Sequence, residues 1–439
     1  MKKVFYTWLI LACLIFNAAP IFSQTFKNDI SFPSETYMLS DVQNDIFIQP
    51  FLKRWRPYDN YVRFSSPSIP FSRRLEKVAS VLKPEDGKLK IQLYEGDDFN
   101  VIKTIESNVK AGKSGVGDKE VVVQIIGDSY TNGAFFKDAL LIKGYVPRLK
   151  MVGLRRVNDM PDQFDEGRGG CTLESYFTVT KVVQRAYNGF WQPKGNDRYW
   201  GSTSFWKMAN DFRKNPNLNP ATNKSWDFGD LYNISRFDSV SFRFDENTGF
   251  LLNPHKGDVQ FDNALNSFVL YNGRKWEKKD YPDLAWSFQY GKYLSMWNIT
   301  PPQMLFEMLG LNDFRDKINH DFLKWNARLM EMKKSYLEAV PDGKFVICTP
   351  ASSCGILDNA AGDFTTMQNA AMWEVRDNII KTFDGQQSDK LFILDVAVSI
   401  DNEKGYRYQD GIQMGNPHPF LNYPAMGISI AAFIQYHRQ

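Results

Sequence analysis

One apolar run constrains the fold of this chain more than any other feature, because it predicts a strand buried on both faces. The run is Val121-Val-Val-Gln-Ile-Ile126, and Gly127-Asp128-Ser129 follows it. Mostly β-branched runs of this kind are typical of parallel sheets that are covered on both sides. A glycine permits a sharp exit from the strand, and the residues from Ala134 to Ile142 suit a helix. Ser129 is therefore expected at a strand-to-helix turn.

The position of Ser129 indicates a place where chemistry can occur. Open α/β sheets bind their ligands at the carboxyl ends of the strands. A helix N-terminus also offers free N–H groups, which stabilise an oxyanion. The alternative is that Asp128 or Ser129 only caps an ordinary turn between a strand and a helix. Partners from other parts of the chain decide between these two interpretations.

From about residue 120, candidate strands alternate with candidate helices. Such alternation predicts an α/β fold with a doubly wound, mostly parallel, five-stranded sheet. The other strand candidates are Leu149–Leu154, Met304–Leu309, Phe345–Thr349 and Leu391–Val396, and the helix candidates are Asp316–Ala339, Thr365–Phe383 and Tyr423–Tyr436.

The sequence pattern before this α/β unit predicts a small β-rich domain over residues 25–117. Their alternating runs suit half-buried antiparallel strands, and a segment rich in Gly, Lys and Ser at 110–119 predicts a linker. The runs lie at residues 45–49, 61–64, 88–94 and 100–105.

The α/β domain is expected to span 118–439 and to contain a long insertion at about 178–300. The insertion is rich in Trp, Tyr, Asn and Pro. A structureless loop of that length is uncommon in a compact domain, so we expect strands and hairpins of its own beside the ligand-binding edge.

The N-terminus has the pattern of a secretory signal peptide over residues 1–23. Met1-Lys2-Lys3 supplies positive charge, an apolar stretch runs to Phe16, and small and polar residues precede Gln24. The apolar stretch is shorter than a normal membrane span. We therefore expect an exported protein, periplasmic, at the cell surface or secreted, with no integral membrane segment after signal removal.

Charge and cysteine content exclude several classes of function. Without Lys2 and Lys3, 51 of the 53 Lys and Arg residues remain and nearly balance the 50 Asp and Glu residues, which gives no electrostatic basis for binding nucleic acid. No spacing of Cys and His is typical of a zinc site. Export permits a disulfide between Cys348 and Cys354, and buried free thiols, including Cys171, are the alternative.

A serine nucleophile needs a general base, and His418 is the best-placed candidate among the four histidines. It lies in Asn416-Pro417-His418-Pro419, where the prolines restrict the backbone. This segment comes after the last predicted strand and before the last predicted helix, so it returns to the edge where Ser129 lies. A turn histidine without a chemical role is the alternative.

Two other loops offer donors for an oxyanion. Gly167-Arg168-Gly169-Gly170-Cys171-Thr172 follows the second predicted strand, and its glycines let the backbone approach a substrate closely. Leu309-Gly310-Leu311-Asn312-Asp313 follows the third, and the Asn312 amide is a donor. Either cluster alone suits an ordinary turn. With the segments that carry Ser129 and His418, these two loops make four candidate segments, each after a different predicted strand and all at the carboxyl edge of the sheet. Four unrelated turns would seldom be arranged in this way.

In these motifs the sequence resembles the SGNH/GDSL hydrolase family of serine esterases. Cys171 stands where that family more often has an aromatic residue, and the insertion has no clear counterpart. The β-rich segment ahead of the unit also resembles exported Bacteroidetes-type esterases encoded with glycan-degradation systems. The matching blocks, in family order, are Gly127-Asp128-Ser129-x-Thr131-x-Gly133, Gly167-Arg168-Gly169-Gly170-Cys171-Thr172, Gly310-Leu311-Asn312-Asp313, and His418-Pro419 followed by Gly427.

The resemblance implies a flavodoxin-like sheet and a role for each matching residue. Ser129 would be the nucleophile and His418 the general base. The backbone N–H groups of Ser129 and Gly170, with the Asn312 amide, would form the oxyanion hole. The family chemistry implies no metal and no cofactor.

One position departs from the family pattern. The family usually has an Asp three residues before the histidine, and this chain has Gly415 there. The acid that orients His418 would then be Asp410, or a backbone carbonyl or Asn416 would take that part. Such an acid fixes the histidine tautomer and stabilises the imidazolium.

The expected function is that of an exported serine hydrolase that cleaves an ester, above all an O-acetyl group, from a carbohydrate through an acyl-enzyme. A lipid or aryl ester is the alternative substrate. A glycan-binding relative that has lost catalysis is the alternative from another class, and Gly415 and the aromatic content favour it. A purely structural surface protein would place Ser129 and His418 far apart.

Overall fold

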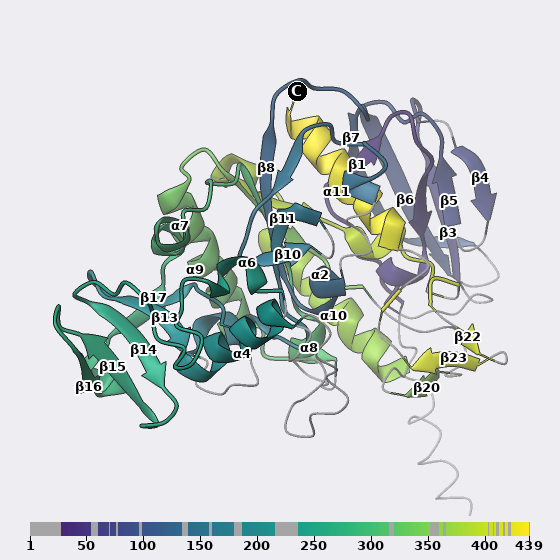
Figure 1. The fold of residues 1–439 in the computed structure, drawn as a ribbon. Coiled ribbons are helices and arrows are strands. Elements are labelled where there is room, and N and C mark those ends of the chain that lie inside the picture. Colours follow the sequence, from purple (N-terminus) through teal and green to yellow (C-terminus); the bar gives the residue numbers. More distant parts are fainter. Residues whose placement is uncertain are drawn as a thin grey trace, which may run out of the picture.

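The computed structural model has a mixed α/β architecture, in which several sheets combine parallel and antiparallel strands (Figure 1). The expected signal peptide, Cys354, Asp410 and Asn416 lie outside the described residues. The structure describes residues 28–438 except for 54–59, 70, 76–77, 96–98, 134–138, 158–159, 180–186, 216–235, 316–319, 352–359, 363–365, 403, 407, 410–411, 416–417 and 420–422.

The largest sheet has seven strands in the order β10-β11-β8-β18-β19-β21, with β9 beside β8. The β10–β11 pair is antiparallel and the other pairs are parallel. The expected sheet of five strands is therefore not what the structure shows. The strands are β8 Val121–Gly127, β9 Leu149–Met151, β10 Arg155–Val157, β11 Met160–Gly167, β18 Met304–Met308, β19 Lys344–Cys348 and β21 Leu391–Leu394.

The difference in strand number arises from the chain between β8 and the insertion. One strand was expected at Leu149–Leu154, but β9 ends at Met151 and two more strands follow it. Strand β11 has no apolar run, and Asp165 and Glu166, near its end, are charged residues that are fully buried. The Leu154 N–H donates to Glu166 at 2.7 Å, so this buried carboxylate has a hydrogen-bond partner that a hydropathy pattern does not show.

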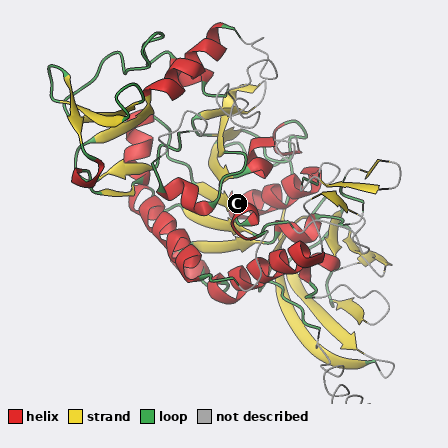
Figure 2. Cartoon of the chain, turned by 90° about the horizontal axis from the view of Figure 1, so that it is seen from below, coloured by secondary structure: helices red, strands yellow, loops and turns green. Residues whose placement is uncertain are grey.

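Three helices contact the sheet where the sequence predicted helices, although α9 begins at Leu323 and not at the expected Asp316. Helix α9 (Leu323–Ala339) contacts β19, α10 (Thr366–Phe383) contacts β21, and α11 (Tyr423–Arg438) contacts β21 and the N-terminal strands β1 and β7. Figure 2 shows the long helices, in red, running alongside the strands. Within the described residues, no helix combines the length and apolar character needed to cross a membrane.

The N-terminal strands form two sheets of their own, β1-β7-β6-β3 and β2-β5-β4, over a separate apolar cluster. Strand β7 extends to Gly112 and pairs with β1, so the first residues of the expected linker are strand. The strands are β1 Glu35–Leu39, β2 Asn44–Phe47, β3 Asn60–Ser65, β4 Phe71–Leu75, β5 Val78–Val81, β6 Gly87–Glu95 and β7 Asn100–Gly112.

The insertion has strands and hairpins of its own, as expected, and lies across the central sheet from the N-terminal strands (Figure 1). Where the structure describes them, its aromatic side chains are largely buried: Trp206, for example, stacks on Phe244 with ring centroids 4.0 Å apart. The elements are β12 Trp191–Pro193, β13 Arg198–Ser202, α4 Thr203–Lys214, α6 Asp238–Ser241, β14 Asp258–Asp262, β15 Ser267–Tyr271, β16 Trp276–Lys279, β17 Trp286–Phe288 and α7 Tyr290–Trp297.

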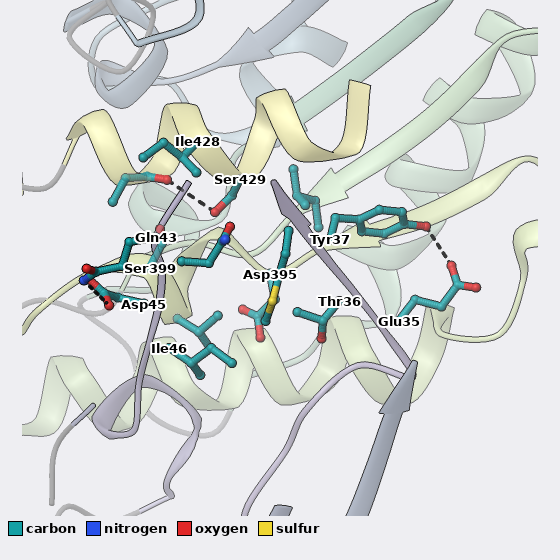
Figure 3. A pocket seen from close by; sticks show the side chains of 15 residues that line it. Glu35, Thr36, Tyr37, Gln43, Asp45, Ile46, Asp395, Ser399, Ile428 and Ser429 are labelled. Carbon is teal, nitrogen blue, oxygen red and sulfur yellow. Dashed lines mark hydrogen bonds between the residues drawn. The ribbon is translucent and has the colours of Figure 1, made fainter. Parts of the chain in front are cut away.

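A cavity of about 90 Å³ lies where β1 and β2 meet β21 and α11 (Figure 3). Its polar side chains are bonded within the protein: Glu35 accepts from the Tyr37 hydroxyl, and Asp395 forms a buried ion pair with Arg376. None of the residues that line it is among the candidate site residues of the sequence. The cavity therefore belongs to the contact between the N-terminal strands and the α/β unit.

Candidate functional site

Ser129 lies at the turn that the sequence predicted. Strand β8 ends at Gly127, and the short helix α2 (Ser129–Gly133) begins at Ser129, which is half-buried. A Cβ atom on Gly127 would lie under 3.0 Å from Thr131 Oγ1 and 3.0 Å from the Met308 carbonyl oxygen. Only a glycine therefore lets the chain turn this closely beside β18.

Asp128 organises the turn from the position before the serine. Its carboxylate accepts the Tyr130 N–H at 3.0 Å, and its carbonyl accepts the Asn132 N–H at 2.9 Å. The side chain is fully buried, and burial raises its pKa to about 7. Asp128 thus caps α2, while the Ser129 side chain is left for other contacts.

The second loop lies beside this turn. Gly167 pairs with Gly127, and the Arg168 N–H donates to the Gly127 carbonyl at 2.9 Å. Gly170 is exposed and has a φ of +72°, a conformation that favours glycine. The contacts of this loop with the serine turn are made by Gly167 and Arg168, and the part of Gly170 as an oxyanion donor stays a prediction.

Asn312 connects all three loops. It lies on the short helix α8 (Leu311–Phe314), and its Nδ2 donates to Asp128 Oδ2 at 3.2 Å and to the Cys171 carbonyl at 3.1 Å. These two bonds engage both N–H groups of the amide. An Asn312 that donates to an oxyanion must therefore exchange one of them when a substrate binds.

Asp313 holds the second and third loops together, a role that sequence reasoning did not assign. Its carboxylate accepts the Leu173 N–H at 3.0 Å and the Gly310 N–H at 3.2 Å. Gly310 has a φ of +111°, so the loop turns in a conformation that glycine favours. The Asn-Asp pair thus uses one side chain to reach the serine turn and the other to fix its own loop.

His418 packs next to the residue that follows the serine. Its ring meets the ring of Tyr130 edge to face, with centroids 5.5 Å apart. Burial and the nearby positive charge of Arg315 lower the pKa of His418 to about 4. The imidazole is therefore neutral at pH 7, which is the form that accepts a proton.

The chain reaches His418 by a different path from the one expected. It does not return directly from the last strand of the large sheet, because a small sheet intervenes in the order β20-β23-β22. Gly415 lies in β23 and pairs with Gly362 of β20. The position that carries an acid in the resembled family is thus a strand residue here. The strands are β20 Ala360–Gly362, β22 Tyr408–Gln409 and β23 Ile412–Gly415.

A buried arginine cluster anchors the far end of α2. Asn132 accepts from Arg155 Nη2 with its side chain and from Arg236 Nη1 with its carbonyl, each at 2.6 Å. Cations near the last carbonyls stabilise a helix C-terminus. Burial, followed by the charge of Arg236, lowers the pKa of Arg155 to about 9. Sequence reasoning missed this cluster, because its members lie far apart along the chain.

Of the two expectations for the cysteines, a disulfide or buried free thiols, the described residues favour buried thiols. Cys348 is a buried free thiol, and burial raises its pKa well above the usual range. Cys171 is buried beside the second loop. Among the described residues, no group of His, Cys, Asp and Glu side chains is arranged to hold a metal ion.

No model of a protein family matches this chain, and no curated protein matches its sequence.

Proposed function

We propose that this protein is an exported serine hydrolase that cleaves ester bonds, O-acetyl groups on carbohydrates above all. One observation carries the proposal: Asn312 bonds to both Asp128 and the Cys171 carbonyl. These bonds join three of the motif-bearing loops at the turn that carries Ser129, and the ring of His418 contacts that of Tyr130, the residue after the serine.

The order of the strands supports the likeness to the SGNH/GDSL hydrolases. When β9 and β11 are counted as one interrupted strand, the order β11-β8-β18-β19-β21 corresponds to 2-1-3-4-5 along the chain. That order is flavodoxin-like, and ligands then bind between the first and third strands, here β8 and β18. Ser129 follows β8 and Asn312 follows β18, so the two residues flank the expected binding position.

The proposed reaction has two steps. Ser129 Oγ attacks the ester carbonyl while His418 accepts its proton, and the alcohol leaves with that proton. Water then attacks the acyl-enzyme, with His418 as the general base. The backbone N–H groups of Ser129 and Gly170, with the Asn312 amide, stabilise the oxyanion in both steps.

The carbohydrate part of the proposal rests on the expected N-terminal export signal and on the resemblance of the motifs to the SGNH/GDSL hydrolases. The aromatic side chains of the insertion give this part little support, because most of those that the structure describes are buried. Lipid and aryl esters therefore belong in the substrate screen.

The direct test is hydrolysis of 4-nitrophenyl acetate by wild type, Ser129→Ala and Ser295→Ala. Ser295 is an exposed serine on α7 and serves as the matched control. We expect Ser129→Ala to reduce kcat by about 10⁴-fold or more, and Ser295→Ala to change little. A wild type no faster than Ser129→Ala contradicts the proposal. Release of acetate from acetylated polysaccharides then identifies the substrate.

A glycan-binding protein without turnover is the second candidate. Two observations favour it: both N–H groups of Asn312 are already bonded, and the pKa of His418 is far below that of an efficient base. Saturable binding of an acetylated polysaccharide, equal in wild type and Ser129→Ala and without acetate release, is its expected signature.

A further inference from the structure

The N-terminal sheet β1-β7-β6-β3 has an outer face that is covered at one end only. Its inner face, with Val109 for example, is buried in the N-terminal apolar cluster. On the outer face, α11 lies against β1 and the end of β7 (Figure 1), where a Cβ on Gly112 would lie 2.8 Å from the Tyr436 backbone nitrogen. Side chains alternate along a strand, so every second residue before Gly112 shares this outer face. Of these, Asn108 to Thr104 are exposed, so the helix leaves the rest of the face open.

Three rows of side chains cross the open part of this face. Residues directly opposite each other in antiparallel strands share a face, and β6 pairs with β3 on one side and with β7 on the other. Neighbouring rows are about 7 Å apart along the strands. One row is apolar and the other two are polar or charged. The rows, taken from β3 through β6 to β7, are Tyr61, Tyr94 and Val101; Arg63, Gln92 and Thr104; and Ser65, Lys90 and Glu106.

The apolar row is the centre of an exposed aromatic cluster. Tyr61 is 51% exposed, and Phe99, which lies just before β7, is 64% exposed. The rings of Tyr94 and Phe99 each meet that of Tyr61 edge to face, with centroids 5.8 and 6.2 Å away. Phe99 has a φ of +50°, a conformation that is costly for a bulky residue. Exposed apolar side chains that gather in one place mark binding surfaces, whereas scattered ones need no explanation.

The polar rows beside this cluster carry an excess of positive charge. Arg63 and Lys90 are exposed, as is Lys88 in the next row along β6. Glu106 is the one acidic side chain of these two polar rows, and it lies 3.5 Å from Lys88 Nζ. Within the described part of the chain, Arg63 and Lys90 form no ion pair. Two cations next to an aromatic surface are therefore open to an anionic ligand.

We propose that this open face binds a chain of an acidic polysaccharide. The apolar C–H face of a sugar ring packs on aromatic rings, and tyrosine suits such a surface because its ring also carries a polar end. Carboxylate or sulfate groups of the same polymer bind the two cations, and a guanidinium offers them two parallel N–H donors. Charge complementarity thus favours an acidic polymer over a neutral one. We call this face the N-terminal platform, and the residues that carry the proposal are Tyr61, Arg63, Lys90, Tyr94 and Phe99.

The N-terminal platform is fixed to the α/β unit by direct hydrogen bonds. Trp373 Nε1 on α10 donates to the Phe51 carbonyl at 3.1 Å, and the Ser34 hydroxyl donates to Asp384 at 2.7 Å. A polymer that binds the platform is therefore held close to the α/β unit, which raises the local concentration of its substituents there. Binding at the platform does not depend on hydrolysis at Ser129.

The test measures retention of the protein on four immobilised polymers. Polygalacturonate, alginate and ι-carrageenan carry carboxylates or sulfates, and methyl-esterified pectin has the polygalacturonate backbone with its charges removed. We expect wild type to bind at least one acidic polymer, and polygalacturonate more tightly than methyl-esterified pectin. Tyr61→Ala and Phe99→Ala should each weaken binding of the acidic polymer by about tenfold. The matched control is Phe242→Ala, which removes an aromatic ring that is 57% exposed on the insertion and should bind as wild type.

Arg63→Gln tests the charge separately from the aromatic surface. We expect it to weaken binding of the acidic polymer by about tenfold, the equivalent of one charge-assisted hydrogen bond, and to change binding of methyl-esterified pectin little. The exposed Arg274→Gln is its control. A selective loss of this kind cannot arise from a defect in folding, which would weaken binding of both polymers alike.

Three results would overturn the proposal. They are no binding of any acidic polymer by wild type, binding that neither Tyr61→Ala nor Phe99→Ala weakens, and equal binding of polygalacturonate and methyl-esterified pectin. Retention on phosphatidylglycerol vesicles but on no polymer would identify a membrane surface instead and would also contradict it. The proposed function is tested apart from this inference. Polymer binding that persists without Ser129-dependent ester hydrolysis contradicts the proposed function and supports the platform.

Discussion

Asn312 donates a hydrogen bond to Asp128 at 3.2 Å, and this bond ties the loop after β18 to the turn after β8. The other carboxylate oxygen of Asp128 accepts the Tyr130 N–H. One buried side chain therefore sets both the start of α2, where Ser129 lies, and the direction of the amide expected to stabilise an oxyanion.

Asp128→Asn should misplace Asn312. The new amide keeps an oxygen for the Tyr130 N–H but turns an NH₂ group toward the Asn312 NH₂, and two donors cannot bond. We expect a loss of about 1–3 kcal/mol in the free energy of unfolding, since buried donors are left without acceptors, and slower ester hydrolysis. Denaturant unfolding and 4-nitrophenyl acetate kinetics measure the two effects. Asp245→Asn, which alters a surface turn of the insertion, is the control. Wild-type stability and activity in Asp128→Asn would contradict this role.

The same carboxyl makes stability depend on pH. Burial raises the pKa of Asp128 from 3.8 to about 7, so the folded protein holds a proton that the unfolded chain releases above about pH 4. Its contribution to stability is full below pH 4 and is lost as pH rises from about 4 to about 7, by about 1.4 kcal/mol per pH unit. Unfolding measured at pH 5 and pH 8 should show a larger loss for wild type than for Asp128→Asn. Equal losses would mean that Asp128 is ionised in the folded protein at both pH values.

The sequence predicted the parts of the site that follow apolar strands. Val121–Ile126 and Met304–Met308 have the composition of buried strands, so the turns at Ser129 and Asn312 could be placed from pattern alone. Strand β11 could not, because Asp165 and Glu166 are stabilised by partners that no hydropathy pattern shows.

The sequence pattern also could not predict contacts between residues that lie far apart in the chain. The Arg236 contact with Asn132 joins residues far apart in the chain, and the Tyr130–His418 ring contact depends on a small sheet that intervenes before His418. Local patterns report which segments become strands and helices. Long-range pairing of charged and aromatic side chains decides how their ends meet.

The proposed general base should titrate far below its usual range. Burial and then the charge of Arg315 lower the pKa of His418 from 6.5 to about 4. The neutral form, which accepts the serine proton, therefore persists in mildly acidic solution. We expect the acid limb of kcat/KM for 4-nitrophenyl acetate to have its midpoint near pH 4, and Arg315→Gln to move that midpoint upward. A midpoint near pH 6.5 in wild type would mean that His418 is exposed or paired with an acid in the active form.

Two glycines of the second loop should respond differently to alanine. A Cβ on Gly167 would lie under 3.0 Å from backbone atoms of Thr131 and Asn132, and arginines fix that end of α2, so it cannot move aside. Gly167→Ala should therefore cost about 1–3 kcal/mol in unfolding free energy and displace α2, with loss of ester hydrolysis. Gly170 faces open space, so Gly170→Ala adds only the strain of its positive φ, about 1 kcal/mol. Thermal unfolding of the two variants compares their losses of stability directly. A larger loss of stability in Gly170→Ala than in Gly167→Ala would mean that the second loop depends on Gly170 and not on its contact with α2.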